Sequence, residues 1–126
     1  IIDDHAVDKE QVKKVLLCSG KIYYELLSAI TERNITDTAL IRIEQLYPLN
    51  KEKLLNIYEK YSSATQKIWV QEEPENQGSG QYFILENLKI GISLTMVSRK
   101  PSSSVSTGFY QIHNKEQKLI VEKALR

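Results

Sequence analysis

The chain has 126 residues, of which 41% are hydrophobic and 26% are charged. This composition is typical of one folded domain of ordinary size, and it excludes disordered and fibrous classes. Lys plus Arg total 17 against 16 Asp plus Glu, so the charge gives no reason to expect nucleic acid or an anionic membrane as the main partner. The single cysteine excludes an internal disulfide and suits a reducing compartment. No apolar run approaches the roughly 20 residues that a membrane-spanning helix needs.

The first twelve residues are polar and acidic without a sustained hydrophobic period, which is typical of a linker. The sequence starts Ile1-Ile2-Asp3-Asp4, with neither an initiator methionine nor a signal-peptide pattern. We therefore expect a segment of a longer protein, in which residues 1–12 are a linker from an upstream domain and residues 13–126 are one domain.

Strand and helix patterns alternate along the first half of this domain. The apolar run Val15–Cys18 predicts a buried strand, and Ala39–Ile43 predicts a second one. Between them, apolar residues at helical spacing predict a helix over about residues 21–33. Asn50 is a good N-cap for a second helix, and the apolar face of this helix is formed by Leu54, Ile57, Tyr58 and Tyr61.

The alternation continues in the second half. Ile68–Val70 and Leu94–Val97 predict two further strands. A helix is expected between them over about residues 81–88, with Tyr82, Leu85 and Leu88 in register. Residues 107–113 predict a fifth strand. Asn114 then caps a last helix, Gln117 completes a capping box at its start, and its buried side is formed by Leu119, Ile120, Val121, Ala124 and Leu125.

This alternating order predicts a single α/β domain. Its sheet is mostly parallel, with the second and third strands pointing the same way, and helices cover both faces.

Familiar motifs of phosphate binding and nucleophilic catalysis are absent. The turn Ser19-Gly20-Lys21 lacks the glycine spacing of dinucleotide-binding and P-loop sequences. Cys18 ends an apolar strand, which favours a core residue over a nucleophile. His5 and His113 show no metal-ligand spacing with it. The sequence therefore identifies no catalytic, cofactor-binding or metal-binding residue in this chain.

The second strand leads into the charged loop Arg42-Ile43-Glu44-Gln45-Leu46-Tyr47-Pro48. Because ligands of α/β proteins bind at the carboxyl ends of strands, Arg42 and Glu44 either meet a ligand or another surface, or pair with each other. Lys51 and Lys53 lie in the first turn of the next helix, where cations oppose the helix dipole unless an anion is bound. Glu52 partly compensates for them, so solvated lysines and an anion site are both open interpretations.

The third strand leads into the polar loop Gln71-Glu72-Glu73-Pro74-Glu75-Asn76-Gln77-Gly78-Ser79-Gly80. Its paired carboxylates could serve acid–base or metal chemistry, although loop acids are more often exposed or ion-paired. The Asn76-Gln77-Gly78 run indicates a shaped turn that delivers the chain to the next helix. These residues predict an interaction loop.

Four runs occur in an order that resembles the C-terminal region of the dehydrogenase component of 2-oxoglutarate dehydrogenase complexes. The resemblance covers about residues 13–125. The runs are Leu16–Tyr24, Arg42–Leu46, Gln71–Pro74 with Asn76–Gly78, and the tail from Arg99-Lys100-Pro101 through the serines to Thr107-Gly108 and His113.

The resemblance implies the transketolase C-terminal fold, a three-layer α/β/α sandwich around a mostly parallel five-strand mixed sheet with one antiparallel edge strand. It implies a homodimeric parent enzyme that uses thiamine diphosphate and magnesium to decarboxylate 2-oxoglutarate. That enzyme transfers the succinyl group to a lipoyl group of the succinyltransferase component. Catalytic and cofactor-binding residues of the family lie in preceding domains. This chain would therefore be inactive alone, would support the dimer and would flank the active-site approach, in the cytoplasm or, for a eukaryote, the mitochondrial matrix.

Some members of that family bind acetyl-CoA as an activator. The resemblance places Gln45 in this effector site and Lys53 where the family has an arginine, and Lys51 adds positive charge. Glu52 departs from the family pattern, because it replaces a second arginine. The remaining family-motif and interface-loop positions are Arg42, Glu44, Glu72, Glu73, Asn76, Gln77 and Gly78.

Two alternatives remain open, of which the first has the same fold and the second belongs to another class. One is the C-terminal domain of another thiamine-diphosphate enzyme, such as a transketolase or a pyruvate or branched-chain dehydrogenase. The run from Gln71 to Gly78 argues against it. The other is a free-standing α/β module that binds an anionic nucleotide through Lys51 and Lys53, against which the missing initiator methionine speaks.

Overall fold

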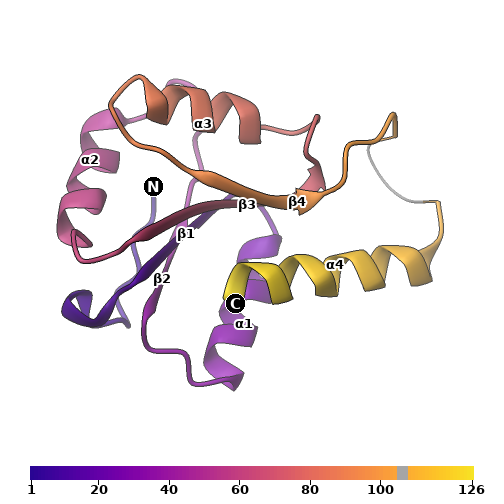
Figure 1. Cartoon of the computed structure of the whole chain (residues 1–126), viewed down its shortest axis with the longest axis horizontal. Helices are drawn as coiled ribbons and strands as arrows, with labels where there is room; N and C mark the ends of the chain where they lie inside the picture. Colours follow the sequence, from indigo (N-terminus) through magenta and orange to yellow (C-terminus); the bar gives the residue numbers. More distant parts are fainter. Residues whose placement is uncertain (105–107) are drawn as a thin grey trace.

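A four-stranded parallel sheet runs through the protein (Figure 1). The computed structural model describes residues 1–104 and 108–126. The strand order is β2-β1-β3-β4 and each neighbouring pair is parallel, so the predicted parallel orientation of the second and third strands is confirmed. The strands are β1 Lys14–Cys18, β2 Thr38–Arg42, β3 Gln66–Pro74 and β4 Thr95–Arg99.

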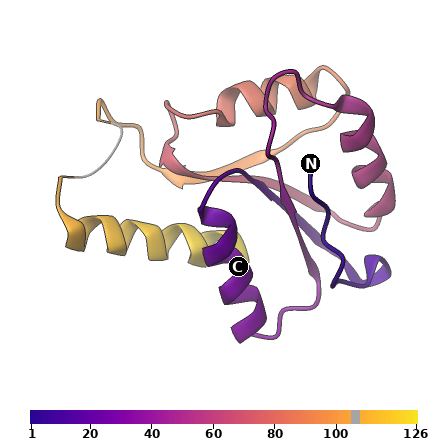
Figure 2. The ribbon, with the colours of Figure 1, turned by 180° about the vertical axis from the view of Figure 1, so that it is seen from behind.

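Helices cover both faces of this sheet, which confirms the three-layer architecture. On one side lie α1 (Ile22–Glu32) and α4 (Tyr110–Leu125), and on the other lie α2 (Lys51–Lys60) and α3 (Gly80–Leu88) (Figures 1 and 2). A short 3₁₀ helix, Lys9–Gln11, precedes β1. Within the described residues, no helix has the length and apolar character that a bilayer-spanning segment requires.

The central strand β1 is buried along its whole length, because it is covered on both faces and flanked on both edges. Its side chains alternate between two cores, as the period of a strand requires. Val15 and Leu17 pack with the α2 and α3 residues, whereas Leu16 and Cys18 pack with α1 and α4. This burial leaves only the strand ends to present polar groups.

The predicted helix starts are correct for α2 and wrong for α4. Asn50 caps α2, because its Oδ1 accepts a hydrogen bond from the Lys53 backbone N–H at 3.0 Å. The fifth strand predicted at residues 107–113 is wrong where it is described: Thr107 lies outside the described residues, and Tyr110 begins α4. Short apolar runs fit both strand and helix, and here the helical continuation decided. Asn114 therefore lies inside α4, whose N-cap is Phe109.

The sheet also has four strands in the described residues rather than the five implied by the family resemblance, and none of the four is antiparallel. Antiparallel pairing among the described residues occurs as an isolated bridge between Ile2 and Arg42, at the edge of β2. Segments 1–12 and β2 consequently lie side by side (Figure 2). Tyr61 Oη donates a hydrogen bond to Asp3 Oδ1 at 2.8 Å and holds the same segment from α2. The domain boundary at residue 13 stays a prediction.

The prediction for the buried face of α3 is wrong, because two of its three apolar residues are exposed to solvent. Leu85 and Leu88 are each 54% exposed, whereas Phe83 and Asn87 are fully buried. Asn87 turns inward because its Oδ1 accepts a 2.6 Å hydrogen bond from the Tyr58 hydroxyl of α2. A buried asparagine has no apolar signature, so the sequence pattern favoured the wrong side of the helix.

Candidate functional site

Charged and polar residues gather where the four strands end. In a parallel sheet all carboxyl ends lie at the same edge, which is where α/β proteins bind ligands. Here β1 ends at Cys18, β2 at Arg42, β3 at Pro74 and β4 at Arg99. The thiol is no candidate nucleophile, because burial raises the pKa of Cys18 to about 12 despite the nearby Arg42.

Arg42 is engaged within the chain. Its Nη2 forms an ion pair with the Glu44 carboxylate, and its Nη1 donates a hydrogen bond to the Tyr24 hydroxyl at 3.0 Å. The guanidinium carbon also lies 5.3 Å from the ring centre of Tyr23, within the range of a cation–π contact. Of the two interpretations left open by the sequence, the Arg42–Glu44 pair is therefore the one that the structure supports.

The three expected effector residues follow in the next segment. Gln45 is exposed, and its Nε2 donates to the carbonyl oxygen of Pro48 at 3.1 Å. Lys51 Nζ lies 2.8 Å from Glu86 Oε2, so this lysine ties α2 to α3. Lys53 is exposed on the first turn of α2. Of the two lysines expected in the effector site, Lys51 is ion-paired and Lys53 forms no ion pair with the described residues. The effector site stays a prediction.

Gln71 organises the loop that follows β3. It is 3% exposed, and its Oε1 accepts a hydrogen bond from Trp69 Nε1 at 2.9 Å. Its Nε2 donates to the carbonyl oxygens of Pro74 and Gln77, both at 2.9 Å, and to that of Glu73 at 3.2 Å. One buried amide therefore connects the strand, the bend and the turn into the next helix.

Two glycines allow the chain to close around this amide. Gly78 has a φ of +69°, in the left-handed region that favours glycine, and a Cβ there would lie 3.1 Å from Glu73 Cβ. At Gly80 a Cβ would collide with Gln71 Oε1 and lie 2.6 Å from Met96 Cε. The expectation of a shaped turn at Asn76-Gln77-Gly78 is met by this geometry.

Glu72 points away from the loop, toward the helices. Its Oε1 accepts a hydrogen bond from Gln117 Nε2 of α4 at 2.5 Å and lies 3.9 Å from Lys21 Nζ. The same Gln117 Nε2 donates to Glu25 Oε1 of α1 at 3.3 Å. Gln117 Oε1 is buried without a hydrogen-bond partner among the described residues. Gln117 therefore bridges two carboxylates instead of closing the predicted capping box.

Asn76 and Gln77 hold the segment that follows β4. Asn76 Nδ2 donates to the Ser102 carbonyl oxygen and Asn76 Oδ1 accepts from the Ser102 N–H, both at 2.9 Å. Gln77 Nε2 donates to the carbonyl oxygens of Ser102 at 2.7 Å and Ser104 at 3.1 Å. The two loops thus form one unit. Sequence reasoning missed the serine partners, since backbone carbonyls carry no residue signature.

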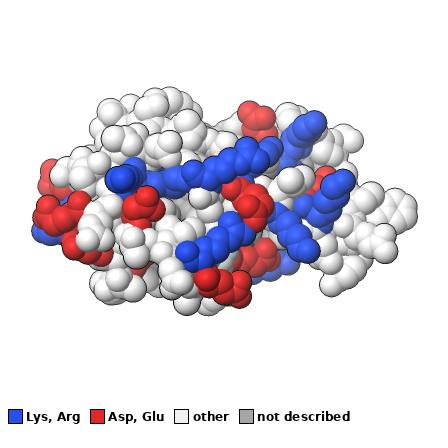
Figure 3. All heavy atoms as spheres, turned by 60° about the horizontal axis from the view of Figure 1, so that its bottom comes forward, with Lys and Arg blue, Asp and Glu red and all other residues white. Residues whose placement is uncertain are grey.

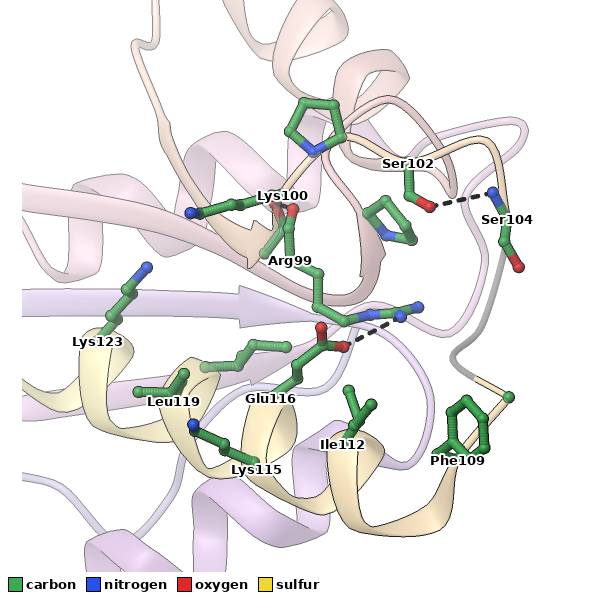
Figure 4. A pocket seen from close by; sticks show the side chains of 15 residues that line it. Arg99, Lys100, Ser102, Ser104, Phe109, Ile112, Lys115, Glu116, Leu119 and Lys123 are labelled. Carbon is green, nitrogen blue, oxygen red and sulfur yellow. Dashed lines mark hydrogen bonds and ion pairs between the residues drawn. The ribbon is translucent and has the colours of Figure 1, made fainter.

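Arg99 joins this unit to α4. Its Nε donates to the Glu72 carbonyl oxygen at 2.7 Å, and its Nη1 lies 3.3 Å from Glu116 Oε2. A groove of about 810 Å³ opens beside this pair, between α4 and residues 98–104 (Figure 4). The sequence analysis identified Arg99-Lys100-Pro101 as part of the family resemblance but did not predict a groove beside it.

Comparison with known proteins identifies the family. Residues 1–125 match the family described as 2-oxoglutarate dehydrogenase C-terminal. The chain belongs to this family. It is 41% identical over 98% of its length to the 2-oxoglutarate dehydrogenase E1 component of Cupriavidus necator, and covers 14% of that protein. The corresponding values for the Haemophilus influenzae E1 component are 39%, 94% and 13%.

A further relative of this dehydrogenase family is the multifunctional 2-oxoglutarate metabolism enzyme of Mycobacterium sp. (strain JLS), which is 40% identical over 93% of the chain. The chain spans 14% or less of the length of these curated relatives. The family resemblance predicted from the four sequence runs is therefore confirmed. Single-residue roles do not follow from family membership, so those assigned to the motif positions stay predictions.

Proposed function

We propose that this chain is the non-catalytic C-terminal domain of a 2-oxoglutarate dehydrogenase. The parent enzyme decarboxylates 2-oxoglutarate and transfers succinyl to lipoyl groups of a succinyltransferase component. The observation that carries the proposal is the family match across residues 1–125, together with relatives named as E1 components.

Thiamine diphosphate and magnesium would be held by other domains of the parent enzyme. The described residues contain no group of three or more His, Cys, Asp or Glu side chains placed to hold a metal ion. Two acids near the carboxyl edge also have protein partners: Glu72 accepts from Gln117, and Glu44 pairs with Arg42. We assign no catalytic step to this domain.

The domain would instead contact the upstream domains and the second subunit of a homodimer. Leu85 and Leu88 support this role, because each is 54% exposed and they lie one turn apart on the outer side of α3. The bacterial relatives support a cytoplasmic location over the mitochondrial matrix.

Substrate profiling of the intact parent protein tests the proposal. With thiamine diphosphate and magnesium present, it should release CO₂ from 2-oxoglutarate and leave pyruvate and branched-chain 2-oxo acids almost untouched. The 126-residue chain alone should release none. Preference of the parent for pyruvate would assign the chain to a different thiamine enzyme, and thiamine-dependent turnover by the isolated chain would contradict its non-catalytic role.

The acetyl-CoA site at Gln45, Lys51 and Lys53 is a subsidiary proposal. Asn50 caps α2, which supports anion binding at its start, but Lys51 is already paired with Glu86. We therefore expect the isolated chain to bind acetyl-CoA at most weakly, with an affinity that falls as salt is added. Calorimetric titration measures this, and micromolar binding that survives Lys53→Ala would place the site elsewhere.

A further inference from the structure

One side of α4 carries apolar residues that do not pack into the core. Six residues of α4 line the groove together with Phe109, which immediately precedes the helix: Ile112, Lys115, Glu116, Leu119, Ile120 and Lys123. Ile112, Glu116, Leu119 and Lys123 recur every three or four residues, which places them on one face of α4. Ile112 and Leu119 are 47% and 46% exposed, in contrast to the core-facing Ile120 at 2%. The helix is therefore apolar on two sides, one toward the sheet and one along the groove.

The rim of the groove is cationic. Lys100, Lys115 and Lys123 line it, and across residues 1–104 and 108–126 their ammonium groups take part in no ion pair or hydrogen bond. The carboxylate among the lining residues is that of Glu116, which already faces Arg99. Lys and Arg side chains form a broad band across this face of the molecule, with Asp and Glu side chains among them (Figure 3). A bound partner would therefore need negative charge as well as apolar surface.

Lysines and apolar residues alternate along the groove, with Lys115 between Ile112 and Leu119 (Figure 4). Lys100 and Lys123 extend toward one end, and Phe109 stands at the other (Figure 4). From Tyr110, where α4 begins, to Lys123 the helical rise of 1.5 Å per residue gives a length of about 20 Å. An elongated groove of this length with an apolar stripe suits a partner helix of about four turns better than a compact small molecule.

We propose that this groove binds an amphipathic, acidic helix from a partner protein. The apolar stripe of that helix would lie on Ile112 and Leu119, and its carboxylates would meet Lys100, Lys115 and Lys123. The opposite wall is already fixed, because Asn76 and Gln77 hold the backbone of residues 102–104. Binding would therefore require little ordering of that wall.

Fluorescence anisotropy with the intact protein tests this proposal. The probe is a labelled 16-residue peptide with leucines at helical spacing on one face and glutamates beside them. The control peptide has the same composition in an order that breaks this spacing. We expect the amphipathic peptide to bind at least tenfold more tightly than its control at physiological salt.

Matched charge reversals locate the site. Lys115→Glu should weaken peptide binding about tenfold. Lys118→Glu makes the same charge change at an exposed α4 position that does not line the groove, and it should alter binding by less than twofold. Leu119→Ser should weaken binding without changing the net charge, which separates the apolar contribution from the electrostatic one. All three side chains are exposed, so folding should be retained.

Several outcomes would overturn the proposal. Equal binding of the two peptides would show general charge attraction only, and equal loss in the Lys115 and Lys118 variants would place the contact outside the groove. Absence of peptide binding, combined with Lys115-dependent binding to phosphatidylserine vesicles, would assign the surface to a membrane instead.

Discussion

Replacing Gln71 by leucine should loosen the loop that follows β3. The substitution keeps the side-chain size roughly constant but removes the acceptor for Trp69 Nε1 and the donor for three carbonyl oxygens. The hydrogen bonds to Trp69 and to the Pro74 carbonyl are buried, so water cannot readily replace them. The loop should open before the sheet does.

The expected size follows from these two buried groups. Each buried polar group left without a partner costs about 1–3 kcal/mol. Partial relaxation of the loop makes about 3 kcal/mol a reasonable total for Gln71→Leu. For a domain of this length, that corresponds to a fall in Tm of about 10 °C.

The chain has a single tryptophan, so its fluorescence reports unfolding at this site directly. Trp69 is 1% exposed and its ring centre lies 4.5 Å from that of Phe83. Gln111→Leu is the matched control, because Gln111 is exposed on α4, and it should change stability by less than about 0.5 kcal/mol. If Gln71→Leu unfolds within about 1 °C of the unaltered chain, the Gln71 amide does not organise this loop.

Three further changes probe other parts of the domain. Phe83→Ala should lower the free energy of unfolding in urea by about 3–5 kcal/mol, because it opens a cavity under α3; a loss below about 1 kcal/mol would contradict its burial. Burial alone would raise the pKa of Asp3, but hydrogen bonds from Lys60 and Tyr61 outweigh it and lower the pKa below the usual 3.8. The stability contributed by this carboxylate is therefore present above pH 3.8 and is lost as the pH falls toward the lower folded-state pKa. In urea titrations, the difference in the free energy of unfolding between the unaltered chain and Asp3→Asn should shrink over that range. A difference that stays constant would refute the assignment. Cys18 should resist iodoacetamide at about pH 8 until the chain unfolds, and rapid alkylation of the folded protein would contradict its burial.

The hydrophobic pattern of the sequence determined most of the layered fold. Val15–Cys18 is apolar at every position because the central strand of a covered parallel sheet has no solvent-facing side. Asn50 correctly predicted the start of α2, because capping is a local interaction between neighbours in the chain. The order of four short runs was also enough to place the chain in its family.

Tertiary structure alone decided which polar groups face inward and which charges meet. Asn87 is buried because it meets Tyr58, which is 29 positions away in the sequence, and Gln117 meets Glu72 across 45 positions. The sequence left Lys51 open as an anion ligand, but in the structure its ammonium group pairs with Glu86 of α3. Periodicity and capping depend on neighbouring residues and can be read along the chain. Pairing of distant polar groups and the shape of a groove between α4 and a loop depend on how finished elements pack, and no local pattern encodes that.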